Sequence, residues 1–270
     1  MKSLLPLIAL IATAHGNVLL PGSDVQGLYD ATLTANDFVL EGEGRCVALG
    51  NQTYRLLLRA EVDGEMKDSE VPGTTDGETG TVTFAGPVGE YAVNLTYAKD
   101  KISGTFGDSA TLTLNKTKRP SPTIGKPAPE GAIVLIDGKN FDNMKPNKGE
   151  WFPADEADNS IQVPKGGMNS IAKFAGSFDA HVEFMCPLEP KKRSQGRGNS
   201  GFYLPSGKEI QVLDSFGTGT YMGGGCGGLY KLKNPDTMAP IPSMAGAKDN
   251  TSNLSSRPPL HWQTYDVEYR

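Results

Sequence analysis

Short apolar runs separated by glycine and aspartate fill residues 17–117. The runs are rich in Val, Thr and Tyr and recur at short intervals, which is typical of antiparallel β-strands. The pattern predicts a small all-β domain. It has no His and no paired catalytic motif, so its composition favours a structural or adhesive role. The strand-like runs are FVLEG, YRLLLRAEVDG, GTVTFAG, EYAVNLTYAKD, KISGTFGD and ATLTLNK.

The pattern changes at KTKRPSPTIGKPAPEG, where four Pro and two Gly fall within sixteen positions and little could enter a core. Proline-rich segments of this kind are extended, semi-rigid spacers. We therefore expect a linker over residues 118–131. A chain of 270 residues also favours two domains over one.

A second series of strand-like runs opens at AIVLIDGKNFDNM and continues with NSIAKF, FDAHVEFMC, SGFYLP, KEIQVLD and WQTYDVEYR. No sustained 3.6-residue period occurs here, so the pattern predicts an all-β sandwich over residues 132–270. The last run alternates up to Arg270 with no turn to close it. Folded proteins avoid open strand edges, so we expect this domain to be truncated at its C-terminus.

Two of these runs carry polar pairs at alternate positions. His181 and Glu183 share one strand face, and Glu209 and Gln211 share another with Leu213. If the two strands are neighbours, a His, two carboxylates and an amide would line one surface, which suits a groove for a polar ligand such as a sugar. The solvated face of an antiparallel sheet has the same alternation, so that interpretation stays open.

Glycine-rich loops accompany these strands, at GRGNSG, FGTGTYMGGGCGGLY and PKGG. Glycine has no Cβ, so such loops approach a ligand closely. No helix follows them, which excludes a phosphate-binding loop. A G-x-S-x-G elbow is also missing, so acyl transfer by Ser200 or another serine is not expected.

The first sixteen residues have the layout of a secretory signal, with one Lys, an apolar run and small residues at Ala12 and Ala14. Cleavage after Ala14 or after Gly16 stays open. The apolar run is too short to cross a bilayer of about 30 Å. We therefore expect a secreted or periplasmic protein without a membrane span. A net charge of -5 without a long basic run argues against a nucleic-acid surface.

Three cysteines occur, at Cys46, Cys186 and Cys226. An odd number in an exported protein permits at most one disulfide within the chain. Cys186 and Cys226 are the favoured pair because both fall in the second domain. Three buried thiols are an equal alternative. The spacing fits no zinc motif.

Six blocks of the second domain together carry a family likeness. In order they are LIDGKNFDN, GSFDAHVEF, QGRGNSGFYL, KEIQVLDSF, GGLY and SSRPPLHWQTYDVEYR. This order resembles the 3-keto-disaccharide hydrolase domain family, secreted bacterial proteins with a concanavalin-like β-sandwich (jelly roll). The resemblance covers roughly residues 131–270. Phe184 stands where the family often has Trp, and the segment between Leu229 and Arg257 is longer than usual.

The resemblance implies a hydrolase or lyase that cleaves glycosides of small saccharides oxidised at C3. A 3-keto group acidifies the C2 proton, so one general base and one donor to the enolate suffice for elimination. Glu209 or His181 is the expected base, and Gln211, Asn199 or Tyr230 the expected donor. The catalytic candidates are Glu209, His181 and Gln211, and the substrate-binding candidates are Asn199, Ser200, Glu183, Asp214 and Tyr230.

Several alternatives stay open on the sequence alone. Glu183 and Glu209 would serve as the carboxylate pair of a conventional glycosidase if about 5 to 10 Å separates them. His181, Glu183 or Glu209 would bind a divalent cation that polarises the keto oxygen. A carbohydrate-binding or adhesion module without catalysis, or a purely structural surface protein, fits the same fold class. Oligomeric state is not predicted.

Overall fold

The computed structural model describes residues 22–137, 141–150, 160–236 and 256–270. Within these ranges the chain is all-β, as predicted, with fourteen strands, one three-residue 3₁₀-helix and no α-helix. The expected signal over residues 1–16 lies outside the described ranges. In the part of the chain that the structure describes, no helix has the length and apolar character needed to cross a membrane.

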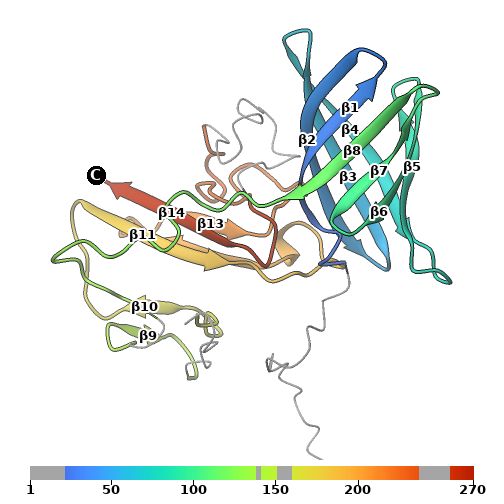
Figure 1. Ribbon diagram of the computed structural model, residues 1–270. Helices are drawn as coiled ribbons and strands as arrows, with labels where there is room; N and C mark the ends of the chain where they lie inside the picture. The colour runs from blue at the N-terminus through green and yellow to red at the C-terminus, as the bar shows by residue number, and fades with distance from the viewer. Residues whose placement is uncertain (1–21, 138–140, 151–159, 237–255) are drawn as a thin grey trace, which may run out of the picture.

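The first eight strands form a closed antiparallel barrel (Figure 1). They are β1 (Gly27–Ala35), β2 (Phe38–Gly50), β3 (Thr53–Val62), β4 (Glu65–Thr75), β5 (Val82–Val88), β6 (Tyr91–Ala98), β7 (Lys101–Phe106) and β8 (Ala110–Thr117). Each strand pairs with the next, and β8 returns to β1, with Leu28 opposite Thr117 and Thr34 opposite Thr111. Closure pairs every strand on both sides, which removes exposed sheet edges.

Alternate side chains of these strands point into the barrel and fill it. Tyr29, Leu56, Phe84, Ile102 and Leu114 are fully buried members of this core. The interior is therefore a packed core of apolar and aromatic side chains. Burying a side chain of this size contributes about 1.5–3 kcal/mol each, so the barrel holds a substantial core of its own.

Two barrel strands, β1 and β4, are absent from the runs that the pattern predicts. β4 buries only Val71 and Gly73 and otherwise carries mostly exposed polar residues. Its place depends on backbone pairing with β3, from Thr53 opposite Thr74 to Val62 opposite Glu65. Hydrophobic periodicity is too weak in such a strand to reveal it.

The second domain contains three two-stranded antiparallel sheets in its described residues. Its elements are β9 (Met144–Pro146), β10 (Met168–Ser170), β11 (Phe178–Met185), η1 (Ser194–Gly196), β12 (Asn199–Tyr203), β13 (Glu209–Leu213) and β14 (Trp262–Tyr269). The sheets pair β9 with β10, β11 with β14 and β12 with β13. The concanavalin-like sandwich stays a prediction.

One strand expected in this domain is not formed. The apolar run AIVLID predicts a strand at its start, which is wrong for residues 132–137. Ile133 is 59% and Val134 43% exposed, because no neighbouring strand among the described residues pairs with them. The run NSIAKF contributes only Asn169 and Ser170, to β10. An apolar run needs a pairing partner as well as β propensity.

Tyr265 connects the β11–β14 sheet to the β12–β13 sheet. Its hydroxyl donates a hydrogen bond to the backbone oxygen of Gln211 on β13 at 2.5 Å. The same hydroxyl accepts from the backbone N–H of Gly227 at 2.8 Å and lies 3.1 Å from the Sγ of Cys226. Through this face of β14, the two sheets contact each other.

All three cysteines are buried, and none of them forms a disulfide. Cys46 lies in the barrel, while Cys186 and Cys226 lie in the second domain. The favoured disulfide between Cys186 and Cys226 is not formed, and the alternative of three buried thiols is the arrangement observed. Burial raises the pKa of both second-domain thiols, which keeps them protonated and unreactive.

The loop that follows β13, residues 214–218, packs against the outer wall of barrel strands β2 and β3. Gly217 has a φ of +58°, and a Cβ at this position would lie 2.4 Å from the Cγ2 of Val47. The backbone oxygen of Gly217 accepts a hydrogen bond from the Arg55 guanidinium. Only glycine fits this contact between the domains.

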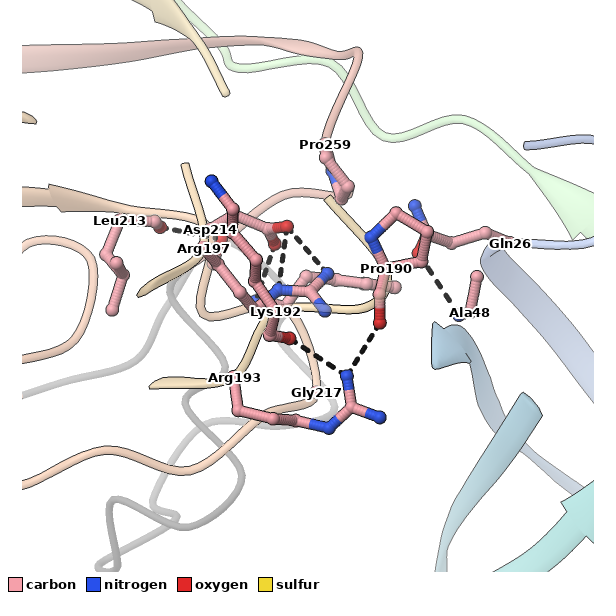
Figure 2. Close-up of polar contacts among 12 residues, drawn as sticks. Gln26, Ala48, Pro190, Lys192, Arg193, Arg197, Leu213, Asp214, Gly217 and Pro259 are labelled. Atoms are coloured by element: carbon pink, nitrogen blue, oxygen red, sulfur yellow. Dashed lines mark hydrogen bonds and ion pairs between the residues drawn. The ribbon is translucent and has the colours of Figure 1, made fainter. Parts of the chain in front are cut away.

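Two arginines strengthen the same junction. Arg45, on β2, is fully buried, and its guanidinium carbon lies 5.3 Å from the centroid of the Phe216 ring. Burial lowers the pKa of Arg45 to about 9, so it remains a cation at neutral pH. Arg193 donates to the backbone oxygen of Leu49 at 2.8 Å, and Figure 2 shows its bond to the carbonyl of Pro190. The barrel is thus packed directly against the second domain.

Candidate active site

Glu209 lies at the start of β13, directly opposite Tyr203 of β12. The Tyr203 hydroxyl donates to Oε2 of Glu209 at 2.9 Å. The carboxylate lies over Gly201, where a Cβ would come within 1.9 Å of Oε1. The missing side chain at Gly201 therefore makes the space that the carboxylate occupies.

Tyr230 flanks Glu209 on the side away from β12. Its backbone N–H donates to the backbone oxygen of Glu209 at 2.9 Å. The Tyr221 hydroxyl donates to the Tyr230 hydroxyl at 2.6 Å. The Tyr203 phenol thus contacts the carboxylate directly, Tyr230 lies next to Glu209 along the other edge of β13, and Tyr221 is bonded to Tyr230. Tyr203 and Tyr221 are 66% and 43% exposed.

Hydrogen bonding raises the pKa of two of these phenols, Tyr203 and Tyr221. The bond to Tyr230 raises the pKa of Tyr221 to about 12. The bond to Glu209 is the main cause that raises the pKa of Tyr203. Both hydroxyls therefore stay protonated well above neutral pH, with the Tyr203 proton directed at Glu209 and the Tyr221 proton at the Tyr230 oxygen.

Gln211 lies two residues along β13 on the same face as Glu209, as predicted, but it is only 1% exposed. Its Nε2 donates to Oε1 of Gln195 at 2.8 Å and to the backbone oxygen of Gly224 at 3.3 Å. Asn199 donates to the backbone oxygen of Gln195 at 3.0 Å. This network connects β13 to η1 and to the glycine-rich loop beneath Glu209.

Asp214 and Ser200 lie away from the Glu209 face. Asp214 is fully buried, and its Oδ2 lies 2.6 Å from Nη2 and 2.9 Å from Nε of the buried Arg197 (Figure 2). Burial raises the pKa of Asp214, and the Arg197 cation limits that rise. Ser200 pairs with Val212 and so points to the opposite face of the β12–β13 sheet.

His181 and Glu183 belong to a second cluster, on β11. Their cross-strand partners on β14 are Asp266 and Thr264. His181 lies between two carboxylates, with Nδ1 2.8 Å from Asp266 Oδ1 and Nε2 3.1 Å from Glu183 Oε1. Burial alone lowers the pKa of His181, but the hydrogen bonds to Asp266 and Glu183 outweigh it and raise the pKa.

The linker lies across this second cluster. The backbone N–H of Gly125 donates to Oε1 of Glu183 at 2.6 Å. The Thr123 hydroxyl donates to Oδ2 of Asp266 at 2.5 Å, and the Ser121 hydroxyl accepts from the backbone N–H of Thr264 at 3.2 Å. The predicted linker is therefore attached to β11 and β14 for part of its length.

The two predicted clusters do not share a surface. β11 pairs with β14 rather than with β12 or β13 among the described residues. Tyr265, which contacts β13, lies on the β14 face opposite to the one that carries Asp266. The polar face of His181 and Glu183 thus points away from Glu209, and these three do not converge on one cation. The described residues contain no group of three or more His, Cys, Asp or Glu side chains arranged to hold a metal ion.

A family model described as the 3-keto-alpha-glucoside-1,2-lyase-like domain matches residues 131–270, more than half of the chain. The chain belongs to this family. The resemblance predicted from the six sequence blocks is thereby confirmed over the same residues. No curated protein and no solved structure shows significant similarity to the chain. The barrel lies outside the family domain, residues 131–270.

Sequence reasoning missed two phenols of the lyase-like domain, Tyr203 and Tyr221. Tyr203 had a readable signal, because the turn at LPSGK closes a tight hairpin and pairing across it places Tyr203 opposite Glu209. Tyr221 had none, because it lies in the glycine-rich loop, where no periodicity fixes its position. Its place next to Tyr230 depends on the tertiary structure alone.

A cleft of about 380 Å³ opens elsewhere, between the barrel and the family domain. Its barrel side includes Asn51 and Tyr54, and its family-domain side includes residues 188–192. The one carboxylate that lines it, Glu189, is bound by Lys192 Nζ at 2.6 Å. None of the predicted site residues lines this cleft, and a site at Glu209 stays a prediction.

Attachment of the linker to the family domain is expected to depend on pH through Asp266. The hydrogen bond from Thr123 of the linker is the main cause that lowers the pKa of Asp266, so its contribution to attachment is present above the ordinary value of 3.8 and lost as pH falls through the lowered value. The carboxylates that raise the pKa of His181 lie on β11 and β14 and stay beside it when the linker detaches, so His181 adds no such dependence.

Hydrogen-exchange protection factors of the Gly125 amide measure this attachment. We expect them to be higher at pH 5.5 than at pH 3, and the difference to vanish in Asp266→Asn. Asp179→Asn is the matched control, because Asp179 is an exposed carboxylate of β11 that pairs with Arg270. Equal protection of the wild-type amide at both pH values would contradict the assignment.

Proposed function

We propose that the chain is an enzyme that cleaves 3-keto-glycosides of small saccharides by elimination across C1 and C2. The carrying observation is the single carboxylate of Glu209, held over Gly201 and bound by the Tyr203 hydroxyl, with Tyr230 next to Glu209 along the other edge of β13 and bonded to Tyr221. Elimination of this kind needs one general base and one hydrogen-bond donor to the enolate oxygen, roles that Glu209 and Tyr230 can take. Membership of the lyase-like family supports the same reaction class.

Glu209 removes the proton from C2 of the sugar, where the neighbouring 3-keto group makes the C–H bond acidic. The electron pair of that bond moves onto the keto oxygen, and the Tyr230 hydroxyl, which accepts from Tyr221 and keeps its own proton, donates a hydrogen bond to the enolate. Collapse of the enolate forms the C1–C2 double bond and breaks the bond from C1 to the leaving oxygen. That oxygen takes up a proton, and addition of water across the double bond completes net hydrolysis.

A conventional two-carboxylate glycosidase receives less support. Glu183 is the partner proposed from sequence, yet it lies on β11 and accepts a hydrogen bond from the linker. Its strand face points away from β13, so Glu183 and Glu209 do not border a common space. His181 is held between two carboxylates that favour its protonated form, which suits it poorly as a base. Glu209 is therefore the base in our proposal.

Gln211, Asn199 and Asp214 act as positioning residues in this proposal. The Gln211 amide is committed to Gln195 and Gly224, and Asp214 is paired with Arg197. They hold β13 and the glycine-rich loop in the arrangement that sets Glu209 among the phenols. We also propose that the chain is exported, and that the two contacting sheets of the family domain belong to a concanavalin-like sandwich.

Turnover of a 3-keto-disaccharide, followed by proton NMR with the full chain, tests the proposed function. We expect loss of the C2 proton signal and release of the free leaving sugar, with an unsaturated 3-keto sugar as a transient species. The parent disaccharide without the keto group should not react. Equal cleavage of both compounds would contradict elimination.

Replacing Gly201 with Ala tests the placement of the carboxylate. The added Cβ would meet Oε1 of Glu209 at 1.9 Å, so the side chain must move away from Tyr203. We expect kcat to fall by roughly 10- to 100-fold, because misplacing a catalytic group by about 1 Å has that effect. The midpoint of thermal unfolding should change little, since the three nearest contacts, with Oε1, Cδ and Cγ of Glu209, all belong to one movable side chain. Unchanged kcat would exclude this geometry for Glu209.

Carbohydrate binding without catalysis is the second candidate function. The observation that favours it is the exposure of Tyr203 and Tyr221, because exposed aromatic rings stack on sugar faces. In this case the wild type would bind the disaccharide with a measurable heat in calorimetry and leave it uncleaved. Tyr221→Ala would then weaken binding, whereas Glu209→Gln would not.

A further inference from the structure

The exposed apolar side chains of the barrel gather at one end. Four large hydrophobic residues are exposed among residues 22–117, and all four lie at the turns of this end. They are Phe38 (55% exposed), Val39 (56%), Met66 (38%) and Tyr91 (49%). Tyr91 also packs on Phe106 of the neighbouring hairpin, with ring centroids 5.3 Å apart.

We call this end the distal rim and define it as residues 35–39, 62–66, 88–91 and 106–110. The family domain packs against the parts of β2 and β3 that lie farther from the distal rim. Arg193 of that domain bonds the backbone oxygen of Leu49, and Gly217 lies against Val47. Figure 1 shows the turn between β1 and β2 and the turn between β3 and β4 on the side away from that domain. The distal rim therefore has no intramolecular partner among the described residues of the family domain.

The distal rim is also strongly acidic. Each of its four turns carries a carboxylate, and the four segments contain no Lys or Arg. The carboxylates are Asp37, Asp63, Glu65, Glu90 and Asp108. Only Glu65 forms an ion pair among the described residues, with Lys67. The opposite end differs, because its turns mix acidic residues with Lys99 and Lys101 and expose no large hydrophobic side chain.

The negative charge of the distal rim indicates which kind of partner can bind there. A second copy of the chain would bring its own five carboxylates against these five, and an anionic lipid surface would repel them as well. A cationic partner is attracted, and apolar side chains on it would cover the exposed Phe38 and Tyr91. A polypeptide segment that alternates basic and apolar residues meets both requirements.

We propose that the distal rim is a docking surface for a basic, apolar-containing polypeptide segment of another protein. The barrel then has a binding function of its own, separate from the chemistry at Glu209. The apolar side chains contribute affinity, and the carboxylates contribute charge selectivity and fast association. This role does not depend on the activity of the family domain.

The experiment titrates the full chain into a fluorescein-labelled peptide of sequence KLKWKLK and follows anisotropy at low and moderate salt. The comparison peptide, SLSWSLS, keeps the apolar residues and removes the charge. We expect the wild type to bind the basic peptide at least tenfold more tightly than the neutral one, and salt to weaken that binding. The double variants Phe38→Ser/Tyr91→Ser and Glu65→Gln/Glu90→Gln should each raise Kd about tenfold.

The matched control is Glu78→Gln/Glu130→Gln, which removes two exposed carboxylates outside the distal rim. Its Kd should equal that of the wild type. An equal loss in this control would show attraction by net charge alone and overturn the proposal. The proposal would also be overturned if both rim variants kept wild-type affinity, or if the basic peptide did not bind at 1 mM chain. Self-association of the wild type that the Phe38→Ser/Tyr91→Ser variant abolishes would overturn it as well. The substituted side chains are exposed, so folding is checked by an unchanged melting curve.

Discussion

Replacing Glu209 with Gln lowers kcat on a 3-keto-glycoside by about 10²- to 10⁴-fold, the range that loss of a general base produces. Gln is nearly isosteric and still accepts the hydrogen bond that Tyr203 donates, so the local structure should persist. The change removes only the ability to take up the C2 proton. KM should change much less than kcat, because the hydrogen-bonding surface presented to the substrate is retained.

Steady-state kinetics with the purified full chain measure this effect, with Glu189→Gln as the matched control. Glu189 is a carboxylate of the same domain that is bound to Lys192, and it has no part in the proposed reaction. It should retain wild-type kcat. If Glu209→Gln keeps its kcat within about threefold of wild type, proton abstraction lies with another group. In that event His181→Gln is the variant to measure next.

Replacing Arg197 with Leu destabilises the folded chain by about 3–5 kcal/mol, because it leaves the buried Asp214 carboxylate without its cation. Both side chains are 0% exposed, so water cannot take the place of the guanidinium. Asp214 also accepts a hydrogen bond from the backbone N–H of Phe216 at 3.3 Å, and Phe216 is the residue that packs on Arg45. The loss should therefore extend to the contact with the barrel.

Urea denaturation gives the free energy of unfolding of the wild type, of Arg197→Leu and of the double variant Arg197→Leu/Asp214→Leu. The double variant should recover much of the lost stability, since two apolar side chains replace a buried ion pair. Lys192→Ala breaks the exposed pair with Glu189 and should change stability by less than about 1 kcal/mol. A similarly small change in Arg197→Leu would mean that Asp214 is not buried as the structure has it.

The sequence predicts strand identity well where one face of a strand is apolar. The runs at β3, β5, β6, β7, β11, β13 and β14 are all recovered. It does not predict barrel closure, because pairing of β1 with β8 joins residues about eighty positions apart and no local pattern encodes such a partner. β4 is missed for a related reason, since it is positioned by its ladder with β3 and buries little.

The candidate site is predicted in part. Alternation correctly places Glu209 and Gln211 on one face, and His181 and Glu183 on another. Whether the two faces meet depends on which strands are neighbours. The strand that pairs with β11 is β14, which lies near residue 265, and it brings Asp266 rather than Glu209 beside His181. Strand order is a property of the whole fold, so the residues alone left the question open.

The attachment of the linker also separates two boundaries that are often treated as one. Sequence similarity begins at residue 131, yet Ser121, Thr123 and Gly125 are bonded to β14 and β11 of the domain that follows. A recombinant fragment cut at residue 131 would lose these partners, leaving the Thr264 amide without Ser121 and Glu183 with His181 but without the Gly125 amide. The segment that packs together therefore begins before the segment that shows sequence similarity. Fusing residues 131–270 alone to another protein would transfer the β11–β14 sheet without its contacts to Ser121, Thr123 and Gly125.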